Sequence, residues 1–122
     1  MIETIADLIV FGAKEVDVNN LRSIPNSGGV YFLCNGLDII YIGHSGGMRD
    51  RVRLHIQVYK VDRILFIRYN GRVRHAFEKL FIQIFKPMFN HQTPDLPDNI
   101  ESLLSQAGGV KGNDFDFLDG YF

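Results

Sequence analysis

The sequence has very little cysteine and no long apolar run. Its single cysteine, Cys34, cannot form a disulfide within the chain, a pattern typical of intracellular proteins. No apolar run approaches the roughly 18 residues that a membrane-spanning helix needs. The first residues, MIETIADLIVF, also lack the basic segment that begins a secretory signal. We therefore expect a cytoplasmic protein without a membrane segment.

Two common kinds of site are missing as well. The four histidines, at positions 44, 55, 75 and 91, and the one cysteine do not have the spacing of zinc ligands. The glycine-rich segment GHSGG (43–47) lacks the consecutive lysine and serine or threonine of a phosphate-binding loop. We therefore expect neither a zinc site nor a nucleotide-binding loop, and we interpret GHSGG as a turn.

The net charge of −1 conceals a basic middle and an acidic end. Residues 44–75 carry eight arginines or lysines against two aspartates, whereas residues 91–122 carry six acids against one lysine. The basic stretch predicts a surface that binds phosphate groups. Two interpretations of the acidic, aromatic residues 113–122 stay open: they cover the basic surface and compete with nucleic acid, or they pack as part of the fold. The basic residues are Arg49, Arg51, Arg53, Lys60, Arg63, Arg68, Arg72 and Arg74.

The apolar pattern predicts one α/β (α+β) domain over residues 1–122. Helical spacing predicts an N-terminal helix over 1–14, and β-formers on both sides of NGLD predict a hairpin. The expected order of helix, hairpin, helix, strand and helix gives a small three-stranded, mostly antiparallel sheet flanked by helices. A capping-box pattern predicts a further helix within the acidic extension 93–122. The expected strands are 29–34, 39–43 and 63–69, and the later helices begin at Met48 and near Asn70.

Five motif elements, in this order along the chain, resemble the GIY-YIG nuclease family. GVYF (29–32) is similar to the first half of the motif that names the family, and YIG (41–43) is identical to the second half. Arg51, Glu78 and the last residue of KPMFN, Asn90, stand where the family has a helix arginine, a metal-binding glutamate and an asparagine. The resemblance covers about residues 24–92 and leaves both ends of the chain outside it.

The resemblance implies a metal-dependent endonuclease that hydrolyses phosphodiester bonds in DNA. In that reaction Glu78 holds one divalent ion, Mg²⁺ or Mn²⁺, since magnesium commonly uses only one or two protein carboxylates. Arg51 provides a permanently charged fork for phosphate. The family analogy makes Tyr31 the general base and Tyr41 the residue that positions the water or relays the proton. Asn90 is assigned to orientation near the metal or phosphate, with packing as the alternative.

The identity of the general base stays open at this stage. Ionising a tyrosine at pH 7 costs about 4 kcal/mol unless nearby positive charge lowers its pKa, whereas a histidine titrates near neutral pH. His55 lies one helical turn after Arg51, where several branches of the family have histidine, and His44 replaces the lysine that many members have after YIG. Both histidines are alternative bases. His44, Arg49 and Arg53 are also expected to bind substrate.

Glu78 is expected at the edge of the buried helix face, in an exposed ion pair with Arg74 four residues earlier. Two other functions compete with the nuclease. One is a catalytically weak nucleic-acid-binding or regulatory module on the same scaffold, and the other is a structural partner within a larger repair or restriction complex. DNA specificity and oligomeric state are left open by the sequence.

Overall fold

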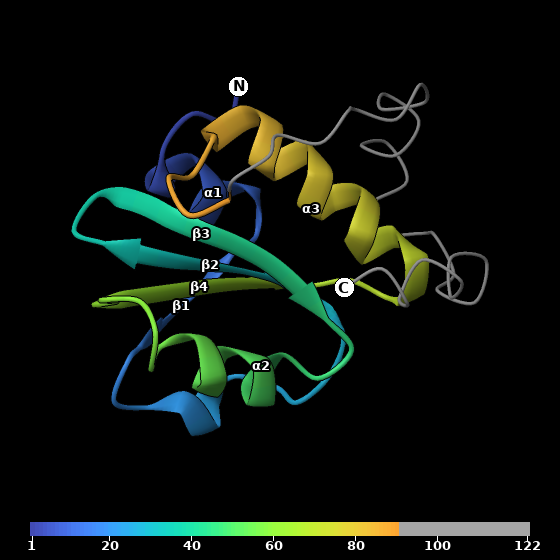
Figure 1. Cartoon of the computed structure of the whole chain (residues 1–122). Coiled ribbons are helices and arrows are strands. Elements are labelled where there is room, and N and C mark those ends of the chain that lie inside the picture. The colour runs from blue at the N-terminus through green and yellow to red at the C-terminus, as the bar shows by residue number, and fades with distance from the viewer. Residues whose placement is uncertain (91–122) are drawn as a thin grey trace.

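The computed structural model describes residues 1–90, which form one antiparallel sheet with helices on both faces (Figure 1). A hairpin precedes the second helix, and the last strand leads directly into the longest helix. The elements are α1 (Ile5–Phe11), β1 (Lys14–Asp17), the 3₁₀ helix η1 (Leu21–Ser23), β2 (Gly29–Asn35), β3 (Asp38–Ser45), α2 (Met48–His55), β4 (Arg63–Arg68) and α3 (Gly71–Phe85).

The sheet has four strands in the order β1-β4-β2-β3, and every pairing is antiparallel. The α+β class is confirmed, but the predicted three strands are one too few. β1 was missed because KEVD buries only Val16 and shows no apolar alternation. The N-terminal helix is shorter than the predicted 1–14, since Thr4 caps its start and Gly12, with a φ of 132°, ends it.

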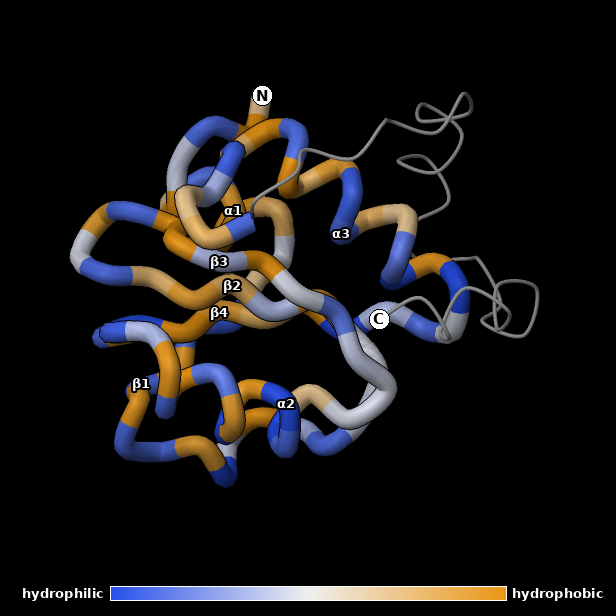
Figure 2. Tube along the Cα trace, in the orientation of Figure 1, coloured by the Kyte–Doolittle hydropathy of each residue, from blue (hydrophilic) through white to orange (hydrophobic). Residues whose placement is uncertain are grey.

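Each face of the sheet has its own hydrophobic core, and Figure 2 shows the apolar strand segments that supply both. Side chains alternate between the faces along a strand. On one face Phe32 packs with Phe77 beneath α1 and α3. On the other face Leu33 packs with Val52 of α2. The central strand β2 is therefore apolar on both sides, which explains why GVYFLC reads as one continuous apolar run.

The β2–β3 hairpin contains a bulge. The cross-strand register changes between Leu33 and Cys34, which leaves Ile40 as an extra residue in β3. Beyond the bulge, Tyr31 lies directly opposite Gly43. Residues opposite each other share a face of the sheet, so the hairpin places the first tyrosine and the glycine of YIG together on the face that α2 covers.

The segment after α3 returns to the edge strand β3. Lys86 adopts the left-handed conformation, with a φ of 47°, and so ends the helix one residue before Pro87. The chain then reverses, and the Phe89 amide donates to the carbonyl oxygen of Ile40 at 3.0 Å. This contact covers part of the β3 edge that would otherwise be unpaired.

Two sequence predictions concern residues beyond position 90, outside the described part of the chain. The capping-box helix and the role of residues 113–122 lie outside residues 1–90. Among the residues described, none of the helices combines the length and the apolar character needed to cross a membrane.

Candidate active site

A cavity of about 150 Å³ lies where the edge strand β3 meets α2 and α3. Every residue that lines it belongs to the set predicted from the sequence. These residues come from β2, β3, α2 and α3, so the fold collects side chains that are up to 47 positions apart. The lining residues are Tyr31, Tyr41, His44, Arg51, His55 and Glu78.

Tyr31 is the most enclosed member of the site. Its side chain is 1% exposed, and its hydroxyl lies 2.8 Å from Nδ1 of His55. The phenol ring lies over Gly43, where an added Cβ would collide with the Tyr31 hydroxyl. The glycine of YIG is therefore required by the space that the first tyrosine occupies. This close approach fixes the hydroxyl at the wall of the cavity.

Aromatic contacts hold Tyr41 and His55 beside Tyr31. The ring of Tyr41 meets the His55 ring edge to face, with centroids 4.8 Å apart. On its other side Tyr41 stacks on Tyr59 at 5.3 Å, and Tyr59 stacks on Phe89 at 4.7 Å. Stacked and edge-to-face arrangements are the favourable geometries for such pairs. The aromatic series connects the site to the segment after α3.

Burial controls protonation on this side of the site. It raises the pKa of Tyr31, an effect that the nearby Tyr41 increases and the Arg51 charge opposes. It also raises the pKa of Tyr41, with a further contribution from Glu78. Burial and then the Arg51 charge lower the pKa of His55 below its usual 6.5. At pH 7 both tyrosines are protonated and His55 is neutral, so an ionised Tyr31 is not the resting state.

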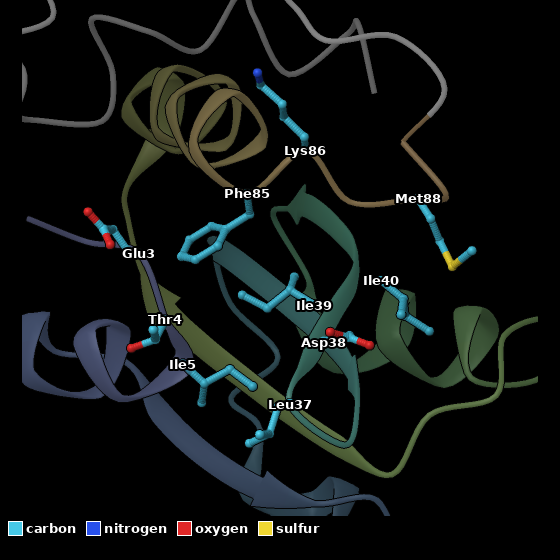
Figure 3. A pocket seen from close by; sticks show the side chains of 10 residues that line it. All are labelled: Glu3, Thr4, Ile5, Leu37, Asp38, Ile39, Ile40, Phe85, Lys86 and Met88. Atoms are coloured by element: carbon cyan, nitrogen blue, oxygen red, sulfur yellow. The ribbon is translucent and has the colours of Figure 1, made fainter.

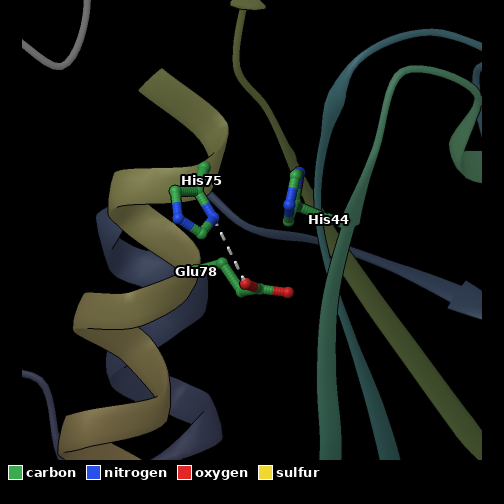
Figure 4. Close-up of side chains that lie close together, drawn as sticks. All are labelled: His44, His75 and Glu78. Atoms are coloured by element: carbon green, nitrogen blue, oxygen red, sulfur yellow. Dashed lines mark ion pairs between the residues drawn. The ribbon is translucent and has the colours of Figure 1, made fainter. Parts of the chain in front are cut away.

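A second group of polar side chains lies on the α3 side of β3. Figure 4 shows His44 on β3 facing His75 and Glu78 on α3. All three are buried, at 5%, 4% and 4% exposure. Nδ1 of His75 lies 3.8 Å from a Glu78 carboxylate oxygen. Neighbouring residues of β3 face opposite ways, so His44 points away from the tyrosines although it adjoins Gly43.

The buried position of Glu78 corrects one sequence prediction. The predicted exposure of Arg74 and Glu78 is wrong, because Arg74 is only 7% exposed and Glu78 only 4%. Burial raises the pKa of Glu78 to about 8, and the backbone amide of His44 partly offsets this effect. Burial also lowers the pKa of His44 to about 3, with contributions from His75 and Arg74. We therefore do not expect His44 to act as a base or as a charged phosphate ligand.

His75 was missed by the sequence reasoning. Burial, followed by the charge of Lys79, lowers its pKa to about 4, so it is neutral at pH 7. Its signal in the sequence was the spacing to Glu78, since residues three apart lie on one face of a helix. No local ligand spacing connects it to His44, because His44 lies 31 residues earlier on a different element.

The predicted arginines have different surroundings. Arg51 is exposed on α2 and lines the cavity. Arg49 donates from Nε to the Ile24 carbonyl at 2.8 Å and from Nη2 to the Arg22 carbonyl at 3.3 Å, which ties α2 to η1. Arg53 is exposed, and its Nη1 lies 3.9 Å from Oδ1 of Asp50. A part for Arg49 or Arg53 in substrate binding stays a prediction.

The predicted basic surface is smaller than the charge count suggested. Arg63 pairs with Glu15 of β1 at 2.6 Å, and Arg74 is buried. These two charges therefore serve the fold. Among the exposed basic residues of the described part of the chain, Arg51 of α2 lines the cavity, and Arg53 is exposed on the same helix.

Asn90 contacts the site through the backbone of β3. Its side-chain amide donates to the Ile42 carbonyl and its side-chain oxygen accepts from the Ile42 amide, both at 2.9 Å. The Asn90 side chain thus makes the pair of hydrogen bonds with Ile42 that a residue of a neighbouring strand would make. It does not line the cavity, and this geometry favours a role in positioning Tyr41 and Gly43, which flank Ile42.

A second cavity, of about 410 Å³, lies between the N-terminal segment, the β2–β3 turn and the end of α3 (Figure 3). Apolar side chains such as Ile39 and Phe85 form much of its wall, with Glu3, Asp38 and Lys86 around them. No histidine or tyrosine lines it. It contains none of the predicted site residues.

The fold is similar to solved structures of the GIY-YIG N-terminal endonuclease domain of UvrC from Thermotoga maritima. The structure of that domain bound to its catalytic divalent cation, magnesium, has a TM-score of 0.53 and 22% identity, over 59% of this chain and 92% of that chain. Two point mutants bound to the catalytic cation have TM-scores of 0.54 and identities of 21% and 23%, over 61% of this chain and 93% of theirs. No family model and no curated protein matches the sequence. The chain therefore has the fold of a GIY-YIG endonuclease domain.

Proposed function

We propose that this protein is a metal-dependent endonuclease that hydrolyses phosphodiester bonds in DNA inside the cell. The observation that carries the proposal is a cavity lined by the buried Tyr31 in contact with the half-buried His55, by an exposed arginine and by a buried glutamate. Hydrolysis of a phosphodiester needs a proton acceptor, positive charge near the phosphate and a way to stabilise the leaving oxygen. The cavity contains a candidate for each of these tasks.

Arg51 binds the phosphate in this proposal. Its guanidinium is planar and always charged, and it matches the geometry of phosphate oxygens. It lines the cavity from α2 and remains exposed to solvent, so a phosphate of a DNA strand can reach it without opening the fold. Arg53 is the next exposed residue of α2, two positions after Arg51, and in this proposal it contacts a neighbouring phosphate.

Tyr31 and His55 form the proton acceptor. Because the pKa of Tyr31 is raised and that of His55 is lowered, both are neutral. In the His55 tautomer that carries its proton on Nε2, the Tyr31 hydroxyl donates to Nδ1 across the 2.8 Å contact. As the attacking water loses a proton to the Tyr31 oxygen, the Tyr31 proton moves to His55 and the water oxygen bonds to phosphorus. The bond between phosphorus and the leaving sugar oxygen breaks, and that oxygen takes up a proton from solvent. The relay avoids a free tyrosinate. Tyr41 orients the water, and Asn90 positions the strand that carries Tyr41.

Glu78 fits the role of ligand for one divalent ion, Mg²⁺ or Mn²⁺. Its carboxyl lines the cavity but is buried strongly enough to raise its pKa to about 8, so a cation beside it offsets the cost of burying its charge. When bound, such an ion supplies positive charge for the phosphate and the leaving oxygen. The similar UvrC domain is described with a catalytic divalent cation bound.

The test is cleavage of supercoiled plasmid, branched DNA and RNA by the purified protein, with Mg²⁺ or with a chelator. We expect Mg²⁺-dependent nicking of DNA. Glu78→Gln keeps the shape of the side chain and removes its charge, so cleavage should fall by about three orders of magnitude, since metal assistance supplies several kcal/mol. DNA binding should persist.

The matched control is Glu3→Gln, which changes a glutamate in the second cavity and should leave cleavage unchanged. Binding of DNA without cleavage by the wild-type protein would instead support the nucleic-acid-binding module. Near wild-type cleavage by Glu78→Gln would refute the metal-dependent mechanism.

A further inference from the structure

We infer that His44, His75 and Glu78 form a metal site that prefers imidazole-binding divalent transition ions, such as Zn²⁺, over Mg²⁺. The inference deepens the proposed function and rests on it only for the use of the ion in cleavage. One ligand atom from each residue lies within 4.8 Å of the others (Figure 4). Glu78 is shared with the proposed nuclease site, and the two imidazoles are additional.

Two packed elements hold the three side chains. His75 and Glu78 lie on one face of α3, and His44 approaches from β3, against which α3 packs. Zinc-to-nitrogen bonds of about 2.0–2.1 Å place tetrahedral ligands roughly 3.4 Å apart. The observed limit of 4.8 Å is wider than this spacing, so the side chains must rotate toward one another to close on an ion.

The contact between His75 and Glu78 also suits an ion. The separation of 3.8 Å between Nδ1 and the carboxylate oxygen is too long for a hydrogen bond between these two atoms. It is close to the spacing of two ligands on one metal.

The type of donor determines the preferred ion. Magnesium favours oxygen ligands and retains several waters, whereas imidazole nitrogen suits Zn²⁺, Co²⁺ and Ni²⁺. Three protein ligands with an open position are typical of catalytic zinc sites. His44 and Glu78 line the cavity that contains Tyr31 and Arg51, so an open position on the ion would face the proposed phosphate site.

The test compares the four histidines of the chain as matched variants in metal titrations of the full-length protein. We expect one Zn²⁺ per chain, bound at least tenfold more tightly than Mg²⁺. His44→Asn and His75→Asn should each weaken Zn²⁺ binding by at least tenfold, whereas His55→Asn and His91→Asn should change it by less than twofold. Equal affinity for Zn²⁺ and Mg²⁺, or equal losses in all four variants, would overturn the site.

A measurement on the wild-type protein covers the case in which a variant fails to fold. Co²⁺ in a four- or five-coordinate site with imidazole ligands absorbs visible light strongly, whereas Co²⁺ surrounded by six oxygens absorbs weakly. We expect the strong spectrum, and addition of Zn²⁺ should abolish it. A weak spectrum would refute the site.

Neither metal readout depends on cleavage, so the two proposals can fail separately. Tight Zn²⁺ binding through His44 and His75 without nuclease activity would leave the site standing and remove the proposed function. Cleavage that needs Glu78 and Mg²⁺, combined with Zn²⁺ binding that is unchanged in both histidine variants, would support the proposed function and refute the zinc site.

Discussion

The two faces of β3 present different chemistry although they belong to one strand. On the α2 face, Tyr31, Tyr41 and His55 form an aromatic group with a 2.8 Å contact between a hydroxyl and an imidazole nitrogen. On the α3 face, His44, His75 and Glu78 are buried, and Nδ1 of His75 lies 3.8 Å from a Glu78 carboxyl oxygen. The first geometry suits transfer of a proton, and the second suits binding of a cation.

In the proposed mechanism, one small sheet separates the binding of a cation from the transfer of a proton. Because β3 is an edge strand, both of its faces border the same cavity. Alternation along the strand then assigns neighbouring residues to different tasks: Gly43 gives space to Tyr31, and His44 points to Glu78. Variants on the two faces should therefore produce separable defects.

The largest effect is expected from Tyr31→Phe, which removes the hydroxyl and keeps the ring. Cleavage should fall by about 10²- to 10⁴-fold, the usual contribution of a positioned proton acceptor. Metal affinity should stay within twofold, because the change lies on the α2 face. Single-turnover cleavage and metal titration of the same preparation check both statements.

The double variant Tyr31→Phe with His55→Asn sharpens this result. Residues that act as one relay lose their function together, so the double variant should cleave no more slowly than the worse single variant. Multiplied losses would show that the two residues act independently.

Arg51→Ala should reduce cleavage by about 10²- to 10³-fold, the range seen when a group that stabilises transition-state charge is removed. DNA affinity should fall far less, since Arg51 is one of several positive residues on α2. The measurements are the cleavage rate at saturating DNA and the dissociation constant in chelator. Arg22→Ala, an exposed arginine on η1 outside the cavity, is the control. Equal losses in binding and cleavage would contradict a transition-state role.

Gly43→Ala tests the packing beneath the α2 face. The new methyl group would collide with the Tyr31 hydroxyl, and inserting a methyl into a packed core costs about 1–3 kcal/mol. We expect a lower midpoint in denaturant unfolding and a loss of cleavage, with Zn²⁺ binding at the α3 face retained. Gly36→Ala is a useful comparison, because nothing lies within 4 Å of its added Cβ but its φ of 63° strains any side chain. It should destabilise the turn without a specific effect on cleavage.

The smallest effect is the pH dependence of cleavage. Burial and Arg51 lower the pKa of His55 below 6.5, so the neutral acceptor is fully present at pH 7 and is lost only as the pH falls through that lowered pKa. The rate at saturating metal and DNA should be flat near neutral pH and then drop about tenfold per pH unit on the acid side. His55→Asn should lower the rate and abolish that drop. A drop of the same shape in His55→Asn would assign the acid limb to another group.

Much of the fold was predictable because strong local patterns define it. The hairpin around NGLD, the helix from Met48 and the long C-terminal helix follow from alternation, helical spacing and turn residues. β1 was not predictable, since KEVD is stabilised by pairing with β4, a contact about 50 residues away that leaves almost no local trace. The bulge at Ile40 was likewise hidden, because a register change depends on both strands.

The five motif elements of the sequence were enough to indicate the GIY-YIG fold and four of the six residues that line one cavity. Only the tertiary structure decided their environments. It buried Glu78 instead of exposing it, committed Arg49, Arg63 and Asn90 to contacts within the fold, and brought His75 to His44 across two elements. The physical reason is that pKa values, ligand geometry and free charges depend on burial and on neighbours distant in the chain, which no local pattern encodes.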